Sequence, residues 1–358
     1  MTNVLPPDPE MAAAGPNDPV PTDKMSLEQI EVAGLSQSQI VRRRFFRHRA
    51  AMISMVVLIA IIVLAVSSIG WGPIPGWWRW NYYDVVGNPV GDRPTLAVFG
   101  IGGHFFQMGE FPFGTSGQNG QDNFAQVMRG IQQTLTVVVV LGVLSTGIGV
   151  LFGAISGFFI GTLDSVLMRF TDLIITLPII LITAVVGQSF GTTGVWPVAL
   201  AMGFLSWTSL ARLVRAEFLT LRERDFVDAA RVAGASSFRI MFKHMLPNSI
   251  GVIVVSMTLT MSGGILTEAA LSYLGFGIQY PDVSLGSLIS QYKGAMQTGE
   301  PYLFLWPGIF IVIIVLCLNF IGDGLRDAFD PRQKRIPKAR ELQRSLAKGE
   351  IETSTAGA

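Results

Sequence analysis

Long uncharged stretches dominate the pattern of hydrophobic and polar positions along the chain. A helix needs about 20 apolar residues to cross a hydrocarbon core about 30 Å thick. The uncharged stretch 173–211 is too long for one span, and the glycine-rich residues 187–194 divide it as a turn would. The pattern therefore predicts six membrane-spanning helices, near 50–70, 131–155, 166–187, 195–214, 249–269 and 303–323.

The composition also favours a membrane protein. Of the 358 residues, 50% are hydrophobic and 14% are charged, whereas soluble domains have about 25% charged residues. So few charges could not cover the surface of soluble domains of this length. The net charge of +1 argues against a nucleic-acid partner. The single cysteine excludes an intrachain disulfide framework and a Cys-rich metal site.

The positions of Lys and Arg predict the orientation of the chain in the membrane. Basic residues are enriched in cytoplasmic loops. With the N-terminus inside, all but four of the 26 basic residues fall on the cytoplasmic side, the exceptions being Arg79, Arg93, Arg129 and Lys293. Both termini are therefore expected in the cytoplasm.

The same pattern divides the chain into five parts. Residues 1–40 are expected to be a disordered cytoplasmic tail, and 41–70 the first transmembrane helix. An extracytoplasmic segment follows at 71–129, then a five-helix core at 130–325 with a cytoplasmic loop at 217–247, and a cytoplasmic tail at 326–358. The aromatic cluster at 71–83 fits a belt at the lipid interface. Its alternative role is to dock an outer partner.

Four glycines in the second predicted span recur at a spacing of four residues. Because residues four apart share one helix face, this pattern predicts a smooth stripe on which another backbone can pack closely. The stripe fits packing within the chain or, alternatively, a sliding interface in a dimer. Its members are Gly149, Gly153, Gly157 and Gly161.

Four ionisable residues are predicted at membrane depth or near its borders: Asp164, Arg169, Asp172 and Glu268. Charges in a membrane are costly and are usually paired or functional. Arg169 precedes Asp172 by three residues, so an ion pair between them is within reach, and such a structural pair is favoured over the alternative of a proton relay. Pro178 is expected to kink the third span. Glu268, near the outer end of the fifth span, is a weaker candidate for a pathway residue.

The cytoplasmic loop between the fourth and fifth spans has two short helical patterns around Gly234. Apolar residues of the first helix recur at Phe226, Ala229, Ala230 and Ala233. Gly234 fits a helix C-terminus with positive φ, and Ser236 fits the cap of a second helix that ends near Pro247. Such helices suit insertion into a groove on another protein or an interfacial position on the membrane.

The loop sequence resembles the EAA loop of bacterial ABC importer permeases, with Asp228 in place of the usual Glu. The similarity extends over about 40–335 and indicates the C-type subunit of the dipeptide/oligopeptide/nickel permease family. It is carried by further motifs: Phe113-Gly114-Thr115 with Gly120 and Asp122, Leu163-Asp164 with Met168-Arg169, Asp172 and Leu177-Pro178, Arg212-Leu213-Val214-Arg215, Leu266 to Leu271, and Gly322 to Asp327.

This resemblance implies an all-α polytopic fold of the type I importer permease, with a cytoplasmic coupling-helix loop. It implies a second permease subunit, two ATP-binding subunits and an extracytoplasmic substrate-binding protein as partners. It also implies ATPase contact through eight loop residues: Asp228, Ala229, Ala230, Gly234, Arg239, His244, Leu246 and Pro247. The chain has no phosphate-loop motif. We therefore expect a subunit without catalytic activity or cofactor of its own, with Mg-ATP bound on the partners.

The expected function is half of the translocation pathway of an ATP-driven importer, with short peptides as the leading substrate class. The same transporter class carrying a nickel chelate, haem, glutathione or oligosaccharide is the alternative. A stand-alone secondary transporter is a more distant one, because it would need a cluster of intramembrane acids or broken helices for ion coupling.

Overall fold

The computed structural model describes residues 37–86, 92–98, 106–107, 109–117, 119–190 and 194–329. The expected disorder of residues 1–40 therefore lies outside the described residues except at 37–40, which begin a helix. The predicted tail after residue 329 and the predicted turn residues 191–193 also lie outside them.

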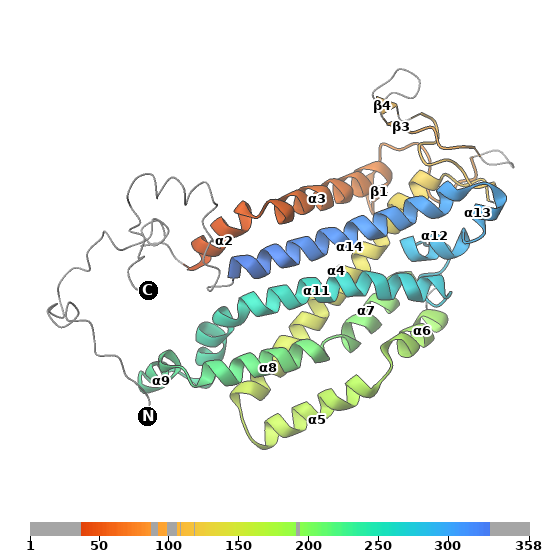
Figure 1. The fold of residues 1–358 in the computed structure, drawn as a ribbon. Coiled ribbons are helices and arrows are strands. Elements are labelled where there is room, and N and C mark those ends of the chain that lie inside the picture. The colour runs from red at the N-terminus through yellow and green to blue at the C-terminus, as the bar shows by residue number, and fades with distance from the viewer. Residues whose placement is uncertain are drawn as a thin grey trace, which may run out of the picture.

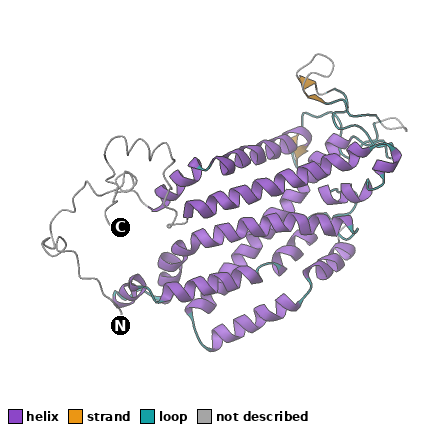
Figure 2. Cartoon of the chain, in the orientation of Figure 1, coloured by secondary structure: helices purple, strands orange, loops and turns teal. Residues whose placement is uncertain are grey.

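The described chain is almost entirely helical (Figure 2), and its long helices lie side by side as a bundle (Figure 1). Five helical segments are long and apolar enough to cross a membrane, and one bent pair makes a sixth. This confirms the prediction of six spans: α3 (Arg49–Ile69), α4 (Asn123–Phe158), α5 (Thr162–Thr176) with α6 (Ile179–Phe190), α7 (Trp196–Leu205) with α8 (Thr208–Arg222), α10 (Ser237–Arg239) with η3 (Ile240–Met245) and α11 (Leu246–Tyr273), and α14 (Pro301–Phe329).

Two of these spans are interrupted. α5 and α6 are bent by 69° at Leu177 and Pro178, because proline cannot donate the backbone hydrogen bond that a continuous helix needs. α7 ends at Leu205 and α8 begins at Thr208, so the fourth span also has a short break. The sequence predicted the kink at Pro178 but not the break between α7 and α8.

Shorter elements complete the fold at the ends of the bundle. The hairpin β1 (Gly70–Trp71) with β2 (Ile74–Pro75) and the antiparallel pair β3 (Ala97–Val98) with β4 (Phe106–Gln107) lie in the predicted outer segment. The remaining short helices are α2 (Gln37–Arg47), α9 (Asp225–Val232), α12 (Leu285–Gln291) and α13 (Ala295–Thr298).

α4 is the central helix of the bundle. It packs along α8, α7, α11 and α3, and α14 packs on α11 and α3. α4 begins at Asn123, eight residues before the predicted start, because the side chain of Asp122 accepts hydrogen bonds from the backbone N–H groups of Phe124 and Ala125 and caps the helix. The first turns of α4 are buried in protein, but they carry Asn123, Gln126 and Arg129, so they were not part of the uncharged stretch.

The outer aromatic cluster is divided between the protein interior and its surface. Trp78 packs on Phe124 with ring centroids 4.7 Å apart, and its indole N–H donates to Asp122 at 2.6 Å. Burial raises the pKa of the Asp122 carboxyl above its usual value, while the hydrogen bonds from Trp78 and the backbone act in the opposite direction. Trp71 and Trp77 are exposed. Trp78 thus joins the outer segment to the start of α4, a packing role that neither interpretation of the cluster included.

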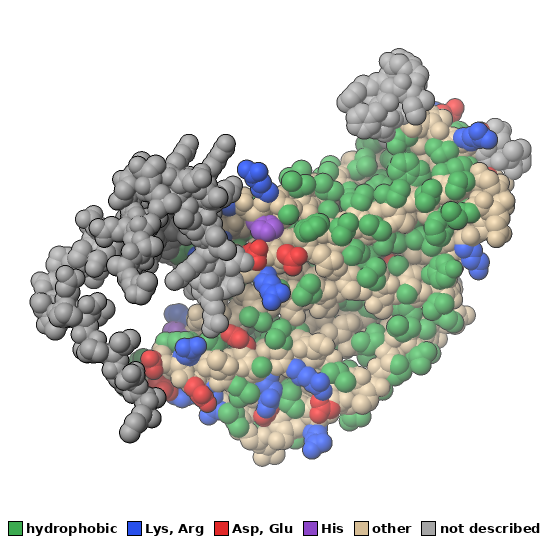
Figure 3. All heavy atoms as spheres, viewed as in Figure 1, with side chains coloured by type: hydrophobic (Ala, Val, Ile, Leu, Met, Phe, Trp, Pro, Cys, Tyr) green, Lys and Arg blue, Asp and Glu red, His purple; other side chains and the backbone are tan. Residues whose placement is uncertain are grey.

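The surface of the bundle has two regions. On the face drawn in Figure 3, hydrophobic side chains cover most of the length of the helices, and many charged side chains gather towards the end where α9 lies. The starting end of α2 and the final turns of α14 lie at that same end of the bundle (Figure 1). This distribution is typical of a membrane-embedded bundle with one strongly charged end.

Candidate coupling surface, intramembrane pairs and cavity

The segment between α8 and α11 forms a compact helical loop. α9 is followed by Gly234, whose φ of +77° is a left-handed conformation that favours glycine. The Ser236 side chain then accepts a hydrogen bond from the backbone N–H of Arg239 and caps α10. These features match the predicted turn and cap.

The second predicted helix does not end at Pro247. α10 continues through η3 directly into α11, and Pro247 lies in the first turn of α11. Proline is tolerated there because the N–H groups of the first helical turn lack an intrahelical partner. His244 lies in the same continuous segment, and its carbonyl accepts a hydrogen bond from the Asn248 side chain at 2.6 Å. The loop is therefore joined rigidly to the fifth span.

One side of this loop is buried against the bundle. Val227 of α9 and Met241 and Met245 of η3 are fully buried, and they belong to one apolar cluster with Val214 and Phe218 of α8. The predicted apolar face of the first helix included Phe226, which is exposed, and did not include Val227, whose burial the sequence analysis missed. Val227 is buried because α9 turns that face towards η3 and α8.

The other side of the loop exposes large apolar side chains. Val232 is 92% exposed and Phe238 is 65% exposed. The rings of Phe238 and Phe242 are stacked, with centroids 6.2 Å apart and planes within 4°. We call Phe226, Val232, Phe238 and Phe242 the coupling surface. Such an exposed apolar group marks an interaction site.

None of the four residues of the coupling surface belongs to the predicted ATPase-contact set, whose members lie in the same loop. Ala229 and Gly234 are exposed, and no atom lies within 4 Å of the position that a Cβ at Gly234 would take. Asp228 pairs with Arg231 on the exposed side of α9, at 2.9 Å. Ala230 and Leu246 are half-buried, and Arg239 is exposed.

The glycine stripe of α4 lies against α8. A Cβ at Gly153 would lie 2.5 Å from the carbonyl oxygen of Ala211, and one at Gly157 would lie 2.6 Å from the Cβ of Phe218. Gly149 is in similar contact with Trp207 and Leu210. The structure therefore places three of the four glycines at a close helix contact within the chain.

Gly161 does not belong to this stripe. It lies beyond the end of α4, at the residue before α5, with φ of +120° and no neighbouring atom within 4 Å of a Cβ position. The helix ends at Phe158, so the four-residue spacing no longer corresponds to one face. Gly161 serves the turn between α4 and α5 instead.

Both aspartates at the start of the third span pair with α8. Asp164 accepts two hydrogen bonds from Arg215, each of 2.7 Å, and Asp172 pairs with Arg212 at 2.5 Å. The predicted pair between Arg169 and Asp172 is wrong: Asp172 binds Arg212, and Arg169 is exposed. Local spacing did not reveal α8, which lies about 40 residues further along the chain.

Glu268 is fully buried between α11 and α4. Its carboxylate accepts hydrogen bonds from Ser272 of the same helix, at 2.7 Å, and from Thr134 of α4, at 3.3 Å. Buried carboxylates are stable only with such partners. Glu268 therefore joins the C-terminal part of α11 to α4, and it is not among the residues that line the cavity described below.

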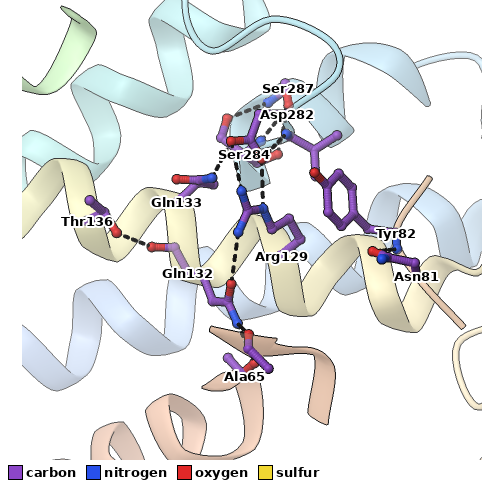
Figure 4. Close-up of polar contacts among 12 residues, drawn as sticks. Ala65, Asn81, Tyr82, Arg129, Gln132, Gln133, Thr136, Asp282, Ser284 and Ser287 are labelled. Atoms are coloured by element: carbon purple, nitrogen blue, oxygen red, sulfur yellow. Dashed lines mark hydrogen bonds and ion pairs between the residues drawn. The ribbon is translucent and has the colours of Figure 1, made fainter. Parts of the chain in front are cut away.

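A further polar cluster, which the sequence analysis missed, surrounds the first turns of α4 (Figure 4). Arg129 donates to both carboxylate oxygens of Asp282, at 2.7 and 3.0 Å, and Gln133 donates to the same carboxylate. Gln132 donates to the carbonyl oxygens of Ala65 and Gly70, both at 2.8 Å. The cluster ties α4 to the end of α3 and to the segment before α12. Adjacent glutamines at the border of an apolar stretch were its only local signal.

A cavity of about 480 Å³ lies among α4, α6, α7, α11 and the break between α5 and α6. It is bordered by Leu177 and Pro178 at the first helix break and by Ser206 at the second. α11 contributes Thr260 and Thr267 with two glycines between them. The lining residues include no charged side chain.

Comparisons with known proteins identify the family. A model of the binding-protein-dependent transport system inner membrane component matches residues 149–335, and a model of the N-terminal TM domain of oligopeptide transport permease C matches residues 36–84. The first of these families has the type I importer permease fold. The matches therefore confirm the resemblance that the sequence motifs carry.

Three curated relatives span most of the chain. An oligopeptide transport system permease protein of Mycobacterium tuberculosis is 37% identical over 84% of this chain and 97% of its own length. One of Haemophilus influenzae is 34% identical over 86% and 93%, respectively. A putative peptide permease protein of Brucella suis is 38% identical over 81% and 89%. From these matches and the helical fold, the chain is a membrane transport permease that belongs to the family of binding-protein-dependent transport system inner membrane components.

Proposed function

We propose that this chain is the C-type permease subunit of an ATP-driven importer of short peptides in a bacterial plasma membrane. The peptide substrate is supported by the names of the relatives, which are oligopeptide or peptide permeases. Both termini and α9 are proposed to lie in the cytoplasm, because the basic residues concentrate in the segments that adjoin them.

The observation that carries this proposal is the exposed coupling surface on a rigidly anchored loop. Four large apolar side chains face outward from α9, α10 and η3, while the opposite side of the loop is buried against α8. A short amphipathic helix that exposes its apolar residues suits a groove on a partner protein. The proposed partner is one of two cytoplasmic ATP-binding subunits.

Movement of the ATPase can pass from this loop into the membrane helices. η3 is continuous with α11, and the loop is packed on α8 through Met241 and Met245. α8 is in turn held to α4 at the glycine stripe and to α5 by the pair of Arg215 with Asp164. A displacement of the loop therefore moves several spans together, as rigid-body transitions between two states require.

The remaining partners follow from the same proposal. A second permease subunit would supply the other half of the pathway, and an extracytoplasmic binding protein would deliver the peptide. This chain would hydrolyse no ATP itself. The ATPases would bind ATP with different affinities in the two states of the transporter. The role of this chain is to use that difference to open the pathway to one side of the membrane or the other.

Substitution of Gly234 tests the coupling role. Gly234→Val places a β-branched residue at φ of +77° and should change the angle between α9 and α10. In proteoliposomes containing the full transporter, we expect ATP-dependent peptide uptake to fall at least about tenfold. The peptide-loaded binding protein should no longer stimulate ATP hydrolysis, whereas the basal ATPase activity should persist.

Gly299→Val is the matched control. Gly299 has φ of +84° in the turn between α13 and α14, and like Gly234 it has open space at its Cβ position. The substitution therefore imposes a similar backbone strain far from the coupling surface. Uptake should remain coupled in this variant. Equal uptake by the Gly234→Val protein and the wild type would contradict the coupling assignment.

Two further assays separate the proposal from its alternatives. Competition of uptake by short peptides, but not by a nickel chelate, haem, glutathione or an oligosaccharide, would support the substrate class. Uptake driven by ATP without an ion gradient would exclude a stand-alone secondary transporter. Uptake by the purified chain alone, driven by an ion gradient, would overturn the proposal.

A further inference from the structure

Two interruptions of helices and one pair of helical glycines meet at the cavity of about 480 Å³. The break between α5 and α6 contributes Leu177 and Pro178, and the break between α7 and α8 contributes Ser206. The glycine pair is Gly263 and Gly264 in the middle of α11. Residues of three separate spans therefore border one space.

Helix breaks at membrane depth leave backbone groups that need partners. The last carbonyls and first N–H groups of a helix have no intrahelical partner, and Pro178 has no N–H to donate. In a membrane, non-helical backbone is tolerated where it is buried in protein or lines a water-filled cavity. At these breaks the Pro178 carbonyl already accepts hydrogen bonds from the backbone N–H groups of Leu181 and Ile182. The Ser206 N–H likewise donates to the Met202 carbonyl. Polar molecules or water in the cavity can bind the helix-end groups that remain.

The side chains of the cavity wall are small, apolar or hydroxylic. Ser206 and Thr260 are half-buried and contribute hydroxyl groups, while the Thr267 hydroxyl donates to the carbonyl of Gly263 at 3.0 Å. Such a wall can exchange hydrogen bonds with amides but offers no ionic partner. Its volume lies within the range of about 300–1,000 Å³ that ligand pockets occupy.

We propose that this cavity binds the main chain of the transported peptide, through the broken ends of α5–α6 and α7–α8 and the Thr260 hydroxyl, without selecting peptide side chains by charge. This inference rests on the proposed function. An extended peptide offers one N–H and one C=O per residue, which are the groups that the helix breaks and hydroxyls can bind.

Two other occupants fit the cavity less well. A lipid acyl chain would leave the backbone groups at the breaks without partners. A side chain of a second permease subunit could fill the space, but it would bind there regardless of the presence of peptide. Labelling by a peptide separates these occupants.

Site-directed crosslinking tests the location. Cys317 is the only cysteine of this chain, so Cys317→Ser removes its thiol, and labelling is then measured on this subunit after separation from its partners. On this background, Thr260→Cys places a thiol in the cavity wall. Leu259→Cys is the matched control, because Leu259 is adjacent in α11, 50% exposed and not among the lining residues. The probe is a tripeptide carrying a bromoacetyl group, supplied to the full transporter in proteoliposomes with its binding protein.

We expect the probe to alkylate Thr260→Cys at least about fivefold more than Leu259→Cys, only when ATP is present, and less when unlabelled peptide competes. Equal labelling of both positions would indicate access through lipid. No labelling of Thr260→Cys in a transporter that still imports peptide would show that the cavity is filled by the partner subunit. Either result would overturn the inference while leaving the proposed function intact.

A charge introduced at Thr260 tests the lack of charge selection. The wild-type transporter, with its binding protein saturated, should import lysine-containing and aspartate-containing tripeptides at similar rates. Thr260→Asp should favour the cationic peptide by about five- to tenfold, the effect of one ion pair in a hydrated site. Thr260→Asn has the same shape without the charge and should show no preference. An unchanged ratio in active Thr260→Asp protein would refute the inference, whereas absence of peptide import by the wild type would refute the proposed function.

Discussion

The contact between α4 and α8 gives the sharpest test of the packing. Gly153→Ala adds one methyl group where the structure has no room for it. The new Cβ would lie 2.5 Å from the Ala211 carbonyl oxygen, 2.7 Å from the Val214 Cβ and 3.1 Å from the Arg215 backbone N. Two of these three atoms belong to the backbone, so rotation of a side chain cannot relieve the contact. The two helices must move apart by several tenths of an ångström.

The expected cost follows from two opposing effects. Overpacking of a tight interior by one methyl group costs about 1–3 kcal/mol, whereas alanine is preferred over glycine within a helix by about 1 kcal/mol. Gly147→Ala is the matched control, because Gly147 is in the same helix and no atom lies within 4 Å of its Cβ position. The helix preference is common to both variants and cancels in their difference. We therefore expect Gly153→Ala to be less stable than Gly147→Ala by about 1–3 kcal/mol.

The free energy of unfolding of the purified subunit, titrated with denaturant in mixed micelles, measures this difference. ATP-dependent uptake by the assembled transporter provides a second measurement, since the contact lies between the coupling loop and the pathway. If Gly153→Ala is as stable as Gly147→Ala, α4 and α8 do not approach as closely as the structure shows. The rigid connection proposed above would then be refuted as well.

Three further substitutions test the polar contacts. Arg215→Gln should destabilise the subunit by more than Arg212→Gln, because Arg215 pairs with the buried Asp164. The pair of Arg212 with Asp172 is half exposed and worth at most about 1 kcal/mol. Equal losses of unfolding free energy in denaturant titrations would contradict the role of burial. Trp78→Phe removes the donor to the buried Asp122 and should cost about 1–3 kcal/mol, whereas Trp77→Phe, at an exposed 3.4 Å contact, should be nearly neutral in the same assay. Burial raises the pKa of Asp122 in the folded state, so the folded protein holds this proton at a higher pH than the unfolded chain does. The free energy of unfolding should therefore fall as pH rises through the interval above the ordinary value of 3.8, and Asp122→Asn should lessen this slope in titrations from acidic to neutral pH.

Local signals in the sequence predicted the coupling loop in part. Gly234 and Ser236 were correctly identified as a turn and a helix cap, because left-handed φ and capping depend on a few neighbouring residues. The burial of Val227 against the bundle was not identified. Which of Phe226 and Val227 is buried depends on where α8 and η3 lie, and the periodicity of one short helix does not contain that information.

For the charged residues, too, the sequence predicted which residues matter but not which residues they contact. The uncharged stretches made Asp164 and Asp172 conspicuous, since the cost of a charge in the membrane is set by the solvent and not by the fold. Their partners, Arg215 and Arg212, belong to another span and were predicted only as members of a family motif. The nearby Arg169 satisfied the local spacing but does not pair with Asp172, because the third span turns its aspartates towards α8.

The sequence by itself determined that the chain is a membrane protein, how many spans it has, which end is basic, and the family to which it belongs. The first three properties depend on the free energy of transferring side chains between water and lipid, which follows from residue type. The family follows from motifs whose order can be read from the sequence. Only the tertiary structure decided that three glycines of α4 meet α8, that the coupling surface is exposed, and that two helix breaks share one cavity. Each of these depends on contacts between residues far apart in the chain, and such contacts arise only when the helices pack.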